Sequence, residues 1–319
     1  MNAVTKSLLL CYLLLLPIFT TAQSAKLAIT LADKLILIEG KVDDRIGYFL
    51  LDLGVSDVIL NSAHFEGVIS KEKGVYGLNG RLSTAETKRV NLSLGNIQWK
   101  NRLTYLLPLN HLEAAKGKEI LGLIGGALFN KCKLLIDLSQ MTVEIEKASS
   151  GESTASYDQH DLAPTSILPF KLKGGMPWVE VRLNHMFFKF GMDTACEYSL
   201  ISAKLLPFLE DLIFNKREVN SRGVSAKIKQ VTAAKLTQLE VGLLTCHPIG
   251  ILFVDMGLIN QNIPGAKLDG ILGFDFLRQF KVAINYHTRE IGLWRHPSAT
   301  KHPILLTQEV SRDSIRLGY

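Results

Sequence analysis

The sequence repeats one pattern in its two halves: an apolar run that ends in a single aspartate, then a turn of small residues and a second apolar run. In the first half the pattern spans residues 45–60 around Asp52, and in the second half it spans residues 186–201 around Asp193. A lone carboxylate inside an apolar run is costly to bury. We therefore expect the fold to bring the two aspartates together, where they can share a proton.

The two halves align over most of their length. An offset of 193 − 52 = 141 residues superposes the aspartates, and it also pairs Phe49 with Phe190 without a gap. A second anchor, a Gly-x-x-Gly segment at 122–125 and again at 270–273, has an offset of 270 − 122 = 148, so seven extra residues lie between the anchors in the second half. An internal duplication of this kind predicts two homologous lobes.

Each half is predicted to be mainly β. Short runs rich in Ile, Leu, Val and Phe alternate with turn pairs such as Asp43-Asp44 and Gly174-Gly175. Only brief helical segments are expected, after each aspartate motif and after each Gly-x-x-Gly segment, at 62–65, 202–210, 127–130 and 274–279. The expected fold is therefore two β-barrel-like lobes with a cleft between them.

The ends of the chain and its middle differ in composition from the lobes. Lys6 precedes an apolar stretch that ends in Thr20-Thr21-Ala22, which is typical of a secretory signal peptide cleaved after Ala22. We expect an exported protein, periplasmic or extracellular, with no stable membrane insertion after cleavage, because no later segment reaches about 20 apolar residues. The predicted divisions are a signal peptide (1–22), an N-terminal lobe (23–147), a polar linker (148–165), a C-terminal lobe (166–296) and a tail (297–319).

Charge and cysteine content exclude several classes of function. The formal net charge of +6 comes from scattered basic residues with no long Lys/Arg block, so no nucleic-acid partner is expected. Beyond the signal peptide, Cys132, Cys196 and Cys246 allow at most one disulfide, and the pairing stays open. No Cys-x-x-Cys or His-x-x-x-His spacing occurs, so neither a metal nor another cofactor is expected.

Two apposed carboxyl groups have a definite chemistry. Like-charge repulsion raises one pKa and lowers the other, so the pair holds a single proton over a wide pH range. The ionised member can take a proton from water while the protonated member donates one to a substrate carbonyl, which suits hydrolysis of an amide. Gly54 lets the first turn fold sharply and lets substrate approach, and Ala195 does so less freely.

This pattern resembles the retropepsin-like aspartic protease family: an apolar strand into Asp-Thr/Ser-Gly, a hairpin, and a later Ile-Leu-Gly segment that runs into a final β-hairpin. Two such units in one exported chain look like the bilobal, pepsin-like architecture. The resemblance covers most of residues 26–146 and 166–295. It implies a catalytic dyad of Asp52 and Asp193, a peptide or protein substrate, and a monomeric enzyme.

The resemblance also implies which other residues meet the substrate. Gly54, Thr194 and Ala195 occupy the motif positions beside the two aspartates. The segment 75–80, with Tyr76 and Gly77, resembles the β-hairpin flap that closes over substrate, since Asn-Gly favours a hairpin turn.

Four residues depart from the family pattern. Leu53 stands where Thr or Ser would brace the two aspartate loops, and it has no hydroxyl. Ala195 replaces glycine, and Cys196 and Glu197 follow where small uncharged residues are usual. Cys196 is expected to be a buried packing residue, whereas Glu197 would disturb the shared proton if it faced the cleft.

Three functions fit these observations. The first is an aspartic endopeptidase that cuts peptide bonds flanked by apolar side chains. The second is a non-catalytic relative that binds peptide or protein in the cleft between the lobes, which Leu53, Ala195 and Glu197 favour. The third is a structural β protein whose aspartates never meet.

Overall fold

The structure is a computed structural model that describes residues 23–70, 76–77, 80–81, 85–147, 163–222, 228–246, 248–262, 265, 267–296 and 314–316. The expected signal peptide and most of the expected linker and tail lie outside these residues. Within them, no helix is long and apolar enough to cross a membrane.

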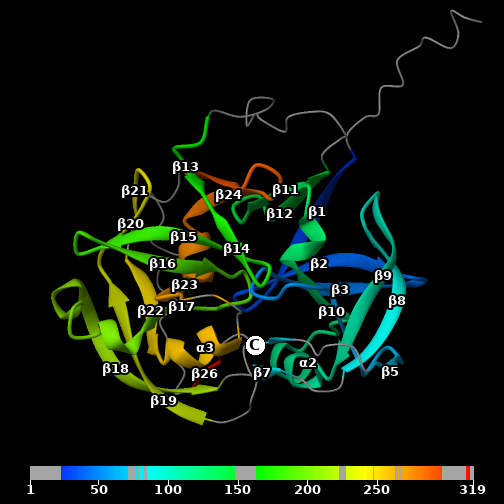
Figure 1. Cartoon of the computed structure of the whole chain (residues 1–319), viewed down its shortest axis with the longest axis horizontal. Helices are drawn as coiled ribbons and strands as arrows, with labels where there is room; N and C mark the ends of the chain where they lie inside the picture. The colour runs from blue at the N-terminus through cyan, green and yellow to red at the C-terminus, as the bar shows by residue number, and fades with distance from the viewer. Residues whose placement is uncertain are drawn as a thin grey trace, which may run out of the picture.

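Six antiparallel strands form a sheet to which both halves of the chain contribute (Figure 1). At its centre β11 pairs with β24, with Leu134 opposite Ile284. This pairing fixes one lobe to the other through main-chain hydrogen bonds. In order, the sheet contains β13 (Ser166–Pro169), β25 (Glu290–Arg295), β24 (Phe280–Asn285), β11 (Cys132–Asp137), β12 (Thr142–Lys147) and β1 (Ser24–Ala32).

The N-terminal lobe continues from β1. Its strands follow in the order β2 (Leu35–Val42), β3 (Arg45–Asp52), β10 (Gly122–Gly125), β4 (Ile59–Asn61), β9 (Ile97–Leu107), β8 (Ala85–Leu94) and β5 (Val68–Ser70). Strand β3, which carries Asp52, runs parallel to β10. A separate hairpin pairs β6 (Tyr76–Gly77) with β7 (Gly80–Arg81).

The C-terminal lobe has a second sheet with the same central arrangement. Strand β16, which leads into Asp193, runs parallel to β23 and pairs with β15 on its other side. The strands are β14 (Lys171–Lys173), β15 (Met176–Leu183), β16 (Met186–Met192), β17 (Ser199–Ser202), β18 (Ile213–Arg222), β19 (Ile228–Leu236), β20 (Leu239–Val241), β21 (Leu244–Cys246), β22 (Ile249–Val254), β23 (Gly270–Leu272) and β26 (Ser314–Arg316).

The strand registers reproduce the duplication residue by residue. Phe49 pairs with Gly122 in the N-terminal lobe, and Phe190 pairs with Gly270 in the C-terminal lobe. These pairs are related by the same offsets of 141 and 148 residues that the sequence contains. The predicted fold class, mainly β with two homologous lobes, is confirmed.

Helix prediction was less accurate. The expected helices at 127–130 and 274–279 are the short elements η1 (Gly126–Phe129) and α4 (Phe274–Leu277), and 202–210 contains η2 (Ala203–Leu205) ahead of η3 (Glu210–Leu212). Residues 62–65 form a turn and not a helix, because His64 N–H and Phe65 N–H donate to Asn61 O and the pattern stops there. Two helices were missed, α2 (Asn110–Lys116) and α3 (Met256–Asn262).

One cluster of buried apolar side chains includes residues of both lobes and of the shared sheet. Its largest members are aromatic: Phe49, Phe129, Phe190, Phe276, Phe280 and Tyr286. Cys132, Cys196 and Cys246 are buried free thiols, so none of the disulfides left open by the sequence forms. The core therefore depends on apolar packing between the lobes.

Candidate active site

The two aspartates lie in equivalent turns at the ends of equivalent strands. Asp52 ends β3, and Asp193 directly follows β16. The Oδ1 atom of each accepts a hydrogen bond from the N–H group two residues later, Gly54 N at 2.9 Å and Ala195 N at 2.8 Å. The side chains are 1% and 2% exposed. Each lobe thus presents one buried carboxyl group, held the same way by its own loop.

The two loops meet. A Cβ atom at Gly54 would lie 2.7 Å from Asp193 Cγ, which is closer than real side chains approach. A side chain at Gly54 would therefore have to displace the carboxyl group of the opposite lobe. The charge of Asp193 also acts directly on Asp52 and raises its pKa, so the hypothesis of a structural β protein whose aspartates never meet is wrong.

A buried hydroxyl braces the loops from one side. Thr194 Oγ1 donates to Leu51 O at 2.6 Å and accepts from Leu53 N at 3.1 Å. The equivalent position in the N-terminal lobe is Leu53, which is fully buried in the apolar core and can make no such bond. The brace is one-sided, as the sequence indicated.

The Gly-x-x-Gly segments pack against the aspartate loops. A Cβ at Gly125 would lie 2.6 Å from Ser56 O, and one at Gly273 would lie 2.5 Å from Cys196 O. Because both obstructing atoms belong to the backbone, neither could move aside cheaply. These glycines therefore leave the space that the close crossing of the two backbone segments needs.

Burial dominates the electrostatics of the pair. It raises the pKa of Asp52 well above its ordinary value, and the negative charge of Asp193 raises it further. Burial also raises the pKa of Asp193, to about 6, against the lowering effect of nearby N–H groups such as that of Ala195. Asp52 Oδ2 is buried without a hydrogen-bond partner among the described residues. These surroundings favour a proton on Asp52 and the charge on Asp193.

The predicted flap forms a hairpin at the backbone level. Tyr76 pairs with Arg81, and Gly77 pairs with Gly80. Strand β7 of this hairpin lies beside α3 of the C-terminal lobe (Figure 1). The hairpin therefore reaches from one lobe to the other, while the side chain of Tyr76 lies outside the described part of the structure.

The two unusual residues after Ala195 have separate environments. Cys196 is buried, and burial raises the pKa of its thiol, so it is a packing residue and not a nucleophile. Glu197 accepts a hydrogen bond from Lys116 Nζ at 2.6 Å and does not stand unpaired beside the dyad. Lys116 is not among the residues that the sequence singled out. The Lys-Gly step at the end of α2 is a helix C-terminal signal, but nothing local connects it to Glu197.

We also searched the described residues for a metal site and for a groove away from the aspartate loops. Among the described residues no group of three or more His, Cys, Asp or Glu side chains could hold a metal ion. A groove of about 890 Å³ lies on the N-terminal lobe, lined by Lys26, Glu39, Tyr48 and Lys100 among others. It includes no residue of either aspartate loop.

No family model matches the sequence, and no curated protein matches it. Comparison with solved structures finds the aspartic proteinase from Irpex lacteus, with a TM-score of 0.53 over 88% of this chain and 99% of that one. The chain has the aspartic proteinase fold. Sequence identity to that enzyme is 11%, so the similarity concerns the arrangement of the chain and not its chemistry.

Proposed function

We propose that the protein is an aspartic-type endopeptidase that hydrolyses peptide bonds with a water molecule activated by Asp52 and Asp193. One observation carries the proposal: two buried carboxyl groups on equivalent turns of two lobes meet at the lobe boundary. Burying two carboxyl groups side by side is costly in free energy. Such costly titratable pairs occur mainly at functional sites, where the shared proton takes part in catalysis.

The two aspartates would have different roles. Asp193, surrounded by more N–H donors, is the base that takes a proton from water while the water oxygen bonds to the peptide carbonyl carbon. Asp52 gives its proton to the carbonyl oxygen, which forms a neutral tetrahedral intermediate. When the C–N bond breaks, Asp193 passes its proton to the leaving nitrogen and Asp52 recovers one from the intermediate's hydroxyl. Atoms and charges balance, and the enzyme returns to its starting state.

The substrate would be an extended peptide with apolar side chains around the cleaved bond. The β6–β7 hairpin supports this proposal, because it crosses from one lobe toward α3 of the other, as a cover over such a chain would. Export from the cell and action as a monomer remain part of the same proposal and rest on the sequence alone.

The test is cleavage of casein and of apolar-flanked peptides from pH 3 to 7, followed by chromatography. Asp52→Asn and Asp193→Asn should each abolish cleavage, whereas Asp44→Asn, at a fully exposed carboxylate, should leave it unchanged. A statine-type inhibitor should also stop the reaction. Cleavage that survives both dyad substitutions would eliminate this mechanism.

A second function, peptide binding without cleavage, is favoured by the buried Leu53 and the one-sided brace it leaves. Loops braced from one side hold the two carboxyl groups less rigidly, and misplacement of catalytic groups is costly. In that case the wild-type protein would bind the same peptides, and Asp52→Asn would bind them equally well. Turnover that the statine-type inhibitor stops would exclude this function.

A further inference from the structure

A buried lysine connects the lobes next to the aspartate pair. Lys116 Nζ, at the end of α2, lies 2.6 Å from Glu197 Oε1 and 2.8 Å from Asp33 Oδ2. Asp33 belongs to the N-terminal lobe and Glu197 to the C-terminal lobe. The Lys116 side chain is 4% exposed and that of Glu197 is 13% exposed. Removing one member of such a buried ion pair leaves the charge of the other without a partner and away from water. Removing one member of a surface ion pair has no such cost.

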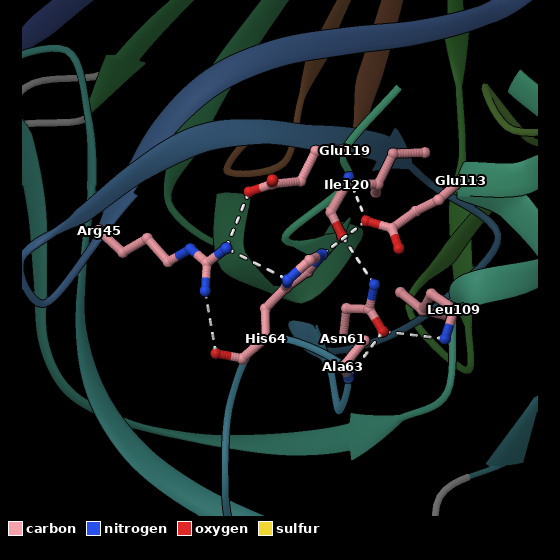
Figure 2. Close-up of polar contacts among 8 residues, drawn as sticks. All are labelled: Arg45, Asn61, Ala63, His64, Leu109, Glu113, Glu119 and Ile120. Carbon is pink, nitrogen blue, oxygen red and sulfur yellow. Dashed lines mark hydrogen bonds and ion pairs between the residues drawn. The ribbon is translucent and has the colours of Figure 1, made fainter. Parts of the chain in front are cut away.

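Helix α2 is held firmly on its own lobe (Figure 2). Glu113 Oε1, one turn before Lys116, accepts from Ile120 N at 2.8 Å and lies 2.6 Å from His64 Nε2. Although burial raises the pKa of Glu113, the hydrogen bond from His64 and that from the Ile120 N–H bring it below its ordinary value, so Glu113 stays ionised. Asn61 Oδ1 accepts from the backbone N–H that precedes the helix, that of Leu109. Lys116 therefore projects from a fixed support.

Glu197 belongs to the loop that carries Asp193. Between the two residues, the backbone N–H of Cys196 donates to Asp193 O at 3.4 Å, and the Cys196 carbonyl accepts from Phe274 N at 2.8 Å. After burial, the charge of Asp193 is the next largest factor that raises the pKa of the Cys196 thiol, and Glu197 and Asp52 raise it as well. All three carboxyl groups act electrostatically on this one thiol, which places Glu197 in the neighbourhood of the dyad.

We propose that Lys116 is a positioning residue: it holds the Asp193 loop against the N-terminal lobe through Glu197 and neutralises that carboxylate beside the dyad. The inference rests on the proposed peptidase function. It explains how the chain keeps a glutamate four positions after Asp193, where an unpaired negative charge would oppose ionisation of the dyad. Lys116 also supplies a further contact between the lobes where Leu53 removes half of the hydroxyl brace.

Other charged groups lie at the same boundary between the lobes and also contribute to the pH dependence of the aspartate pair. Lys34 Nζ lies 3.0 Å from Asp275 Oδ1 and 3.6 Å from the centre of the Tyr198 ring, and Arg278 lies beside Asp275. In the described part of the chain, the groups that act on the aspartate loop or its neighbours include Asp33, Lys34, Asp52, Lys116, Asp193, Cys196, Glu197, Asp275 and Arg278. Substitutions at Lys116 and Glu197 keep the contacts of the Lys34–Asp275 pair, although Glu197→Gln removes a charge that raises the pKa of Lys34.

The experiment compares Lys116→Met, Glu197→Gln, the double variant and Lys116→Arg. The matched control is Lys26→Met, which breaks an ion pair of the same length, 2.6 Å to Glu144, with both side chains well exposed. We expect Lys116→Met to lower kcat about tenfold or more with KM within about twofold, because a misplaced catalytic group loses transition-state stabilisation.

We also expect Lys116→Met to move the pH profile of kcat/KM to higher pH. Glu197→Gln should move the profile to lower pH, and the double variant should return it to the wild-type position. Lys116→Arg should retain most of the activity, and Lys26→Met all of it.

A measurement that needs no turnover distinguishes a failure of the peptidase proposal from a failure of the positioning role of Lys116. In ¹³C NMR of the aspartate carboxyl carbons, Lys116→Met should raise the apparent pKa of the dyad, and the double variant should restore it. If the wild type does not cleave peptides but these shifts occur, the peptidase proposal fails and the positioning role stands. If neither the pH profile nor the carboxyl titration changes in Lys116→Met, the positioning inference is overturned, whatever happens to stability.

Discussion

Replacing Asp193 with asparagine is expected to stabilise the protein at neutral pH, even though it removes a proposed catalytic group. Asparagine keeps the shape of the side chain, and its oxygen can still accept from Ala195 N. It removes a charge that is buried against a second carboxyl group. The effect follows from the surroundings of the group and is independent of whether the protein is an enzyme.

The magnitude follows from the pKa of Asp193, which is raised from 3.8 to about 6 in the folded protein. A shift of one unit corresponds to about 1.4 kcal/mol, so ionising this group in the folded state costs about 3 kcal/mol relative to the unfolded chain. Between these two values the folded state binds the proton more tightly than the unfolded state. The contribution to stability is therefore fully present below pH 3.8 and is lost as the pH rises through about 6. Removal of the Asp193 charge also lets the pKa of Asp52 fall, which acts in the same direction.

The assay is urea unfolding followed by tryptophan fluorescence at several pH values from 4 to 7.5. Asp193→Asn should exceed the wild type in free energy of unfolding by about 3 kcal/mol at pH 7.5, and this difference should shrink as the pH falls toward 4. Asp44→Asn, at a fully exposed carboxylate, should run parallel to the wild type throughout. Parallel curves for Asp193→Asn, or a variant that is less stable at pH 7.5, would refute the argument that a buried charge next to Asp52 destabilises the native state.

Three other substitutions test the supports of the site. Thr194→Val should lower the free energy of unfolding by about 2 kcal/mol, because it orphans buried backbone groups of the opposite loop; thermal denaturation checks this, and Thr194→Ser should recover most of the loss. Gly273→Ala should cost more than about 2 kcal/mol, since the new Cβ would lie 2.5 Å from the carbonyl oxygen of Cys196; a variant that denatures at the wild-type urea concentration would show that the crossing can relax. Asn61→Leu should cost about 3 kcal/mol or more, because this buried side chain makes three hydrogen bonds to backbone groups. For Asn61→Leu the measurement is chemical denaturation, and a loss below about 1 kcal/mol would contradict the role given to that side chain.

Much of the fold could be predicted because the sequence contains an internal duplication. The aspartate motif and the Gly-x-x-Gly segment occur in the same order in each half, and strand pairing preserves their separations. The paired residues Asp137 and Asn285, for example, begin the last turn of each lobe with the same cap: their Oδ1 atoms accept from backbone N–H groups two and three positions later. Repeated local chemistry gives repeated local structure, so one half serves as a check on the other.

The helices were harder to predict because their local signals are short. Helix α2 has seven residues, and Leu109, the N-cap residue before it, makes no side-chain cap. What holds it is a set of contacts with Asn61 and His64, which are distant in sequence. A segment of this length has little helical stability of its own, so tertiary contacts decide its conformation.

Three features follow from the order of the residues alone: the two lobes, the positions of Asp52 and Asp193 at equivalent turns, and the loss of one hydroxyl at Leu53. The pairing of Glu197 with Lys116, 81 residues away, could be seen only in the folded chain, where it leaves no unpaired glutamate beside the dyad. The difference lies in how far apart in the sequence the interacting residues are. Strand patterns and tight turns are fixed by neighbouring residues, whereas the partner of a buried charge depends on which surfaces the packed lobes bring together.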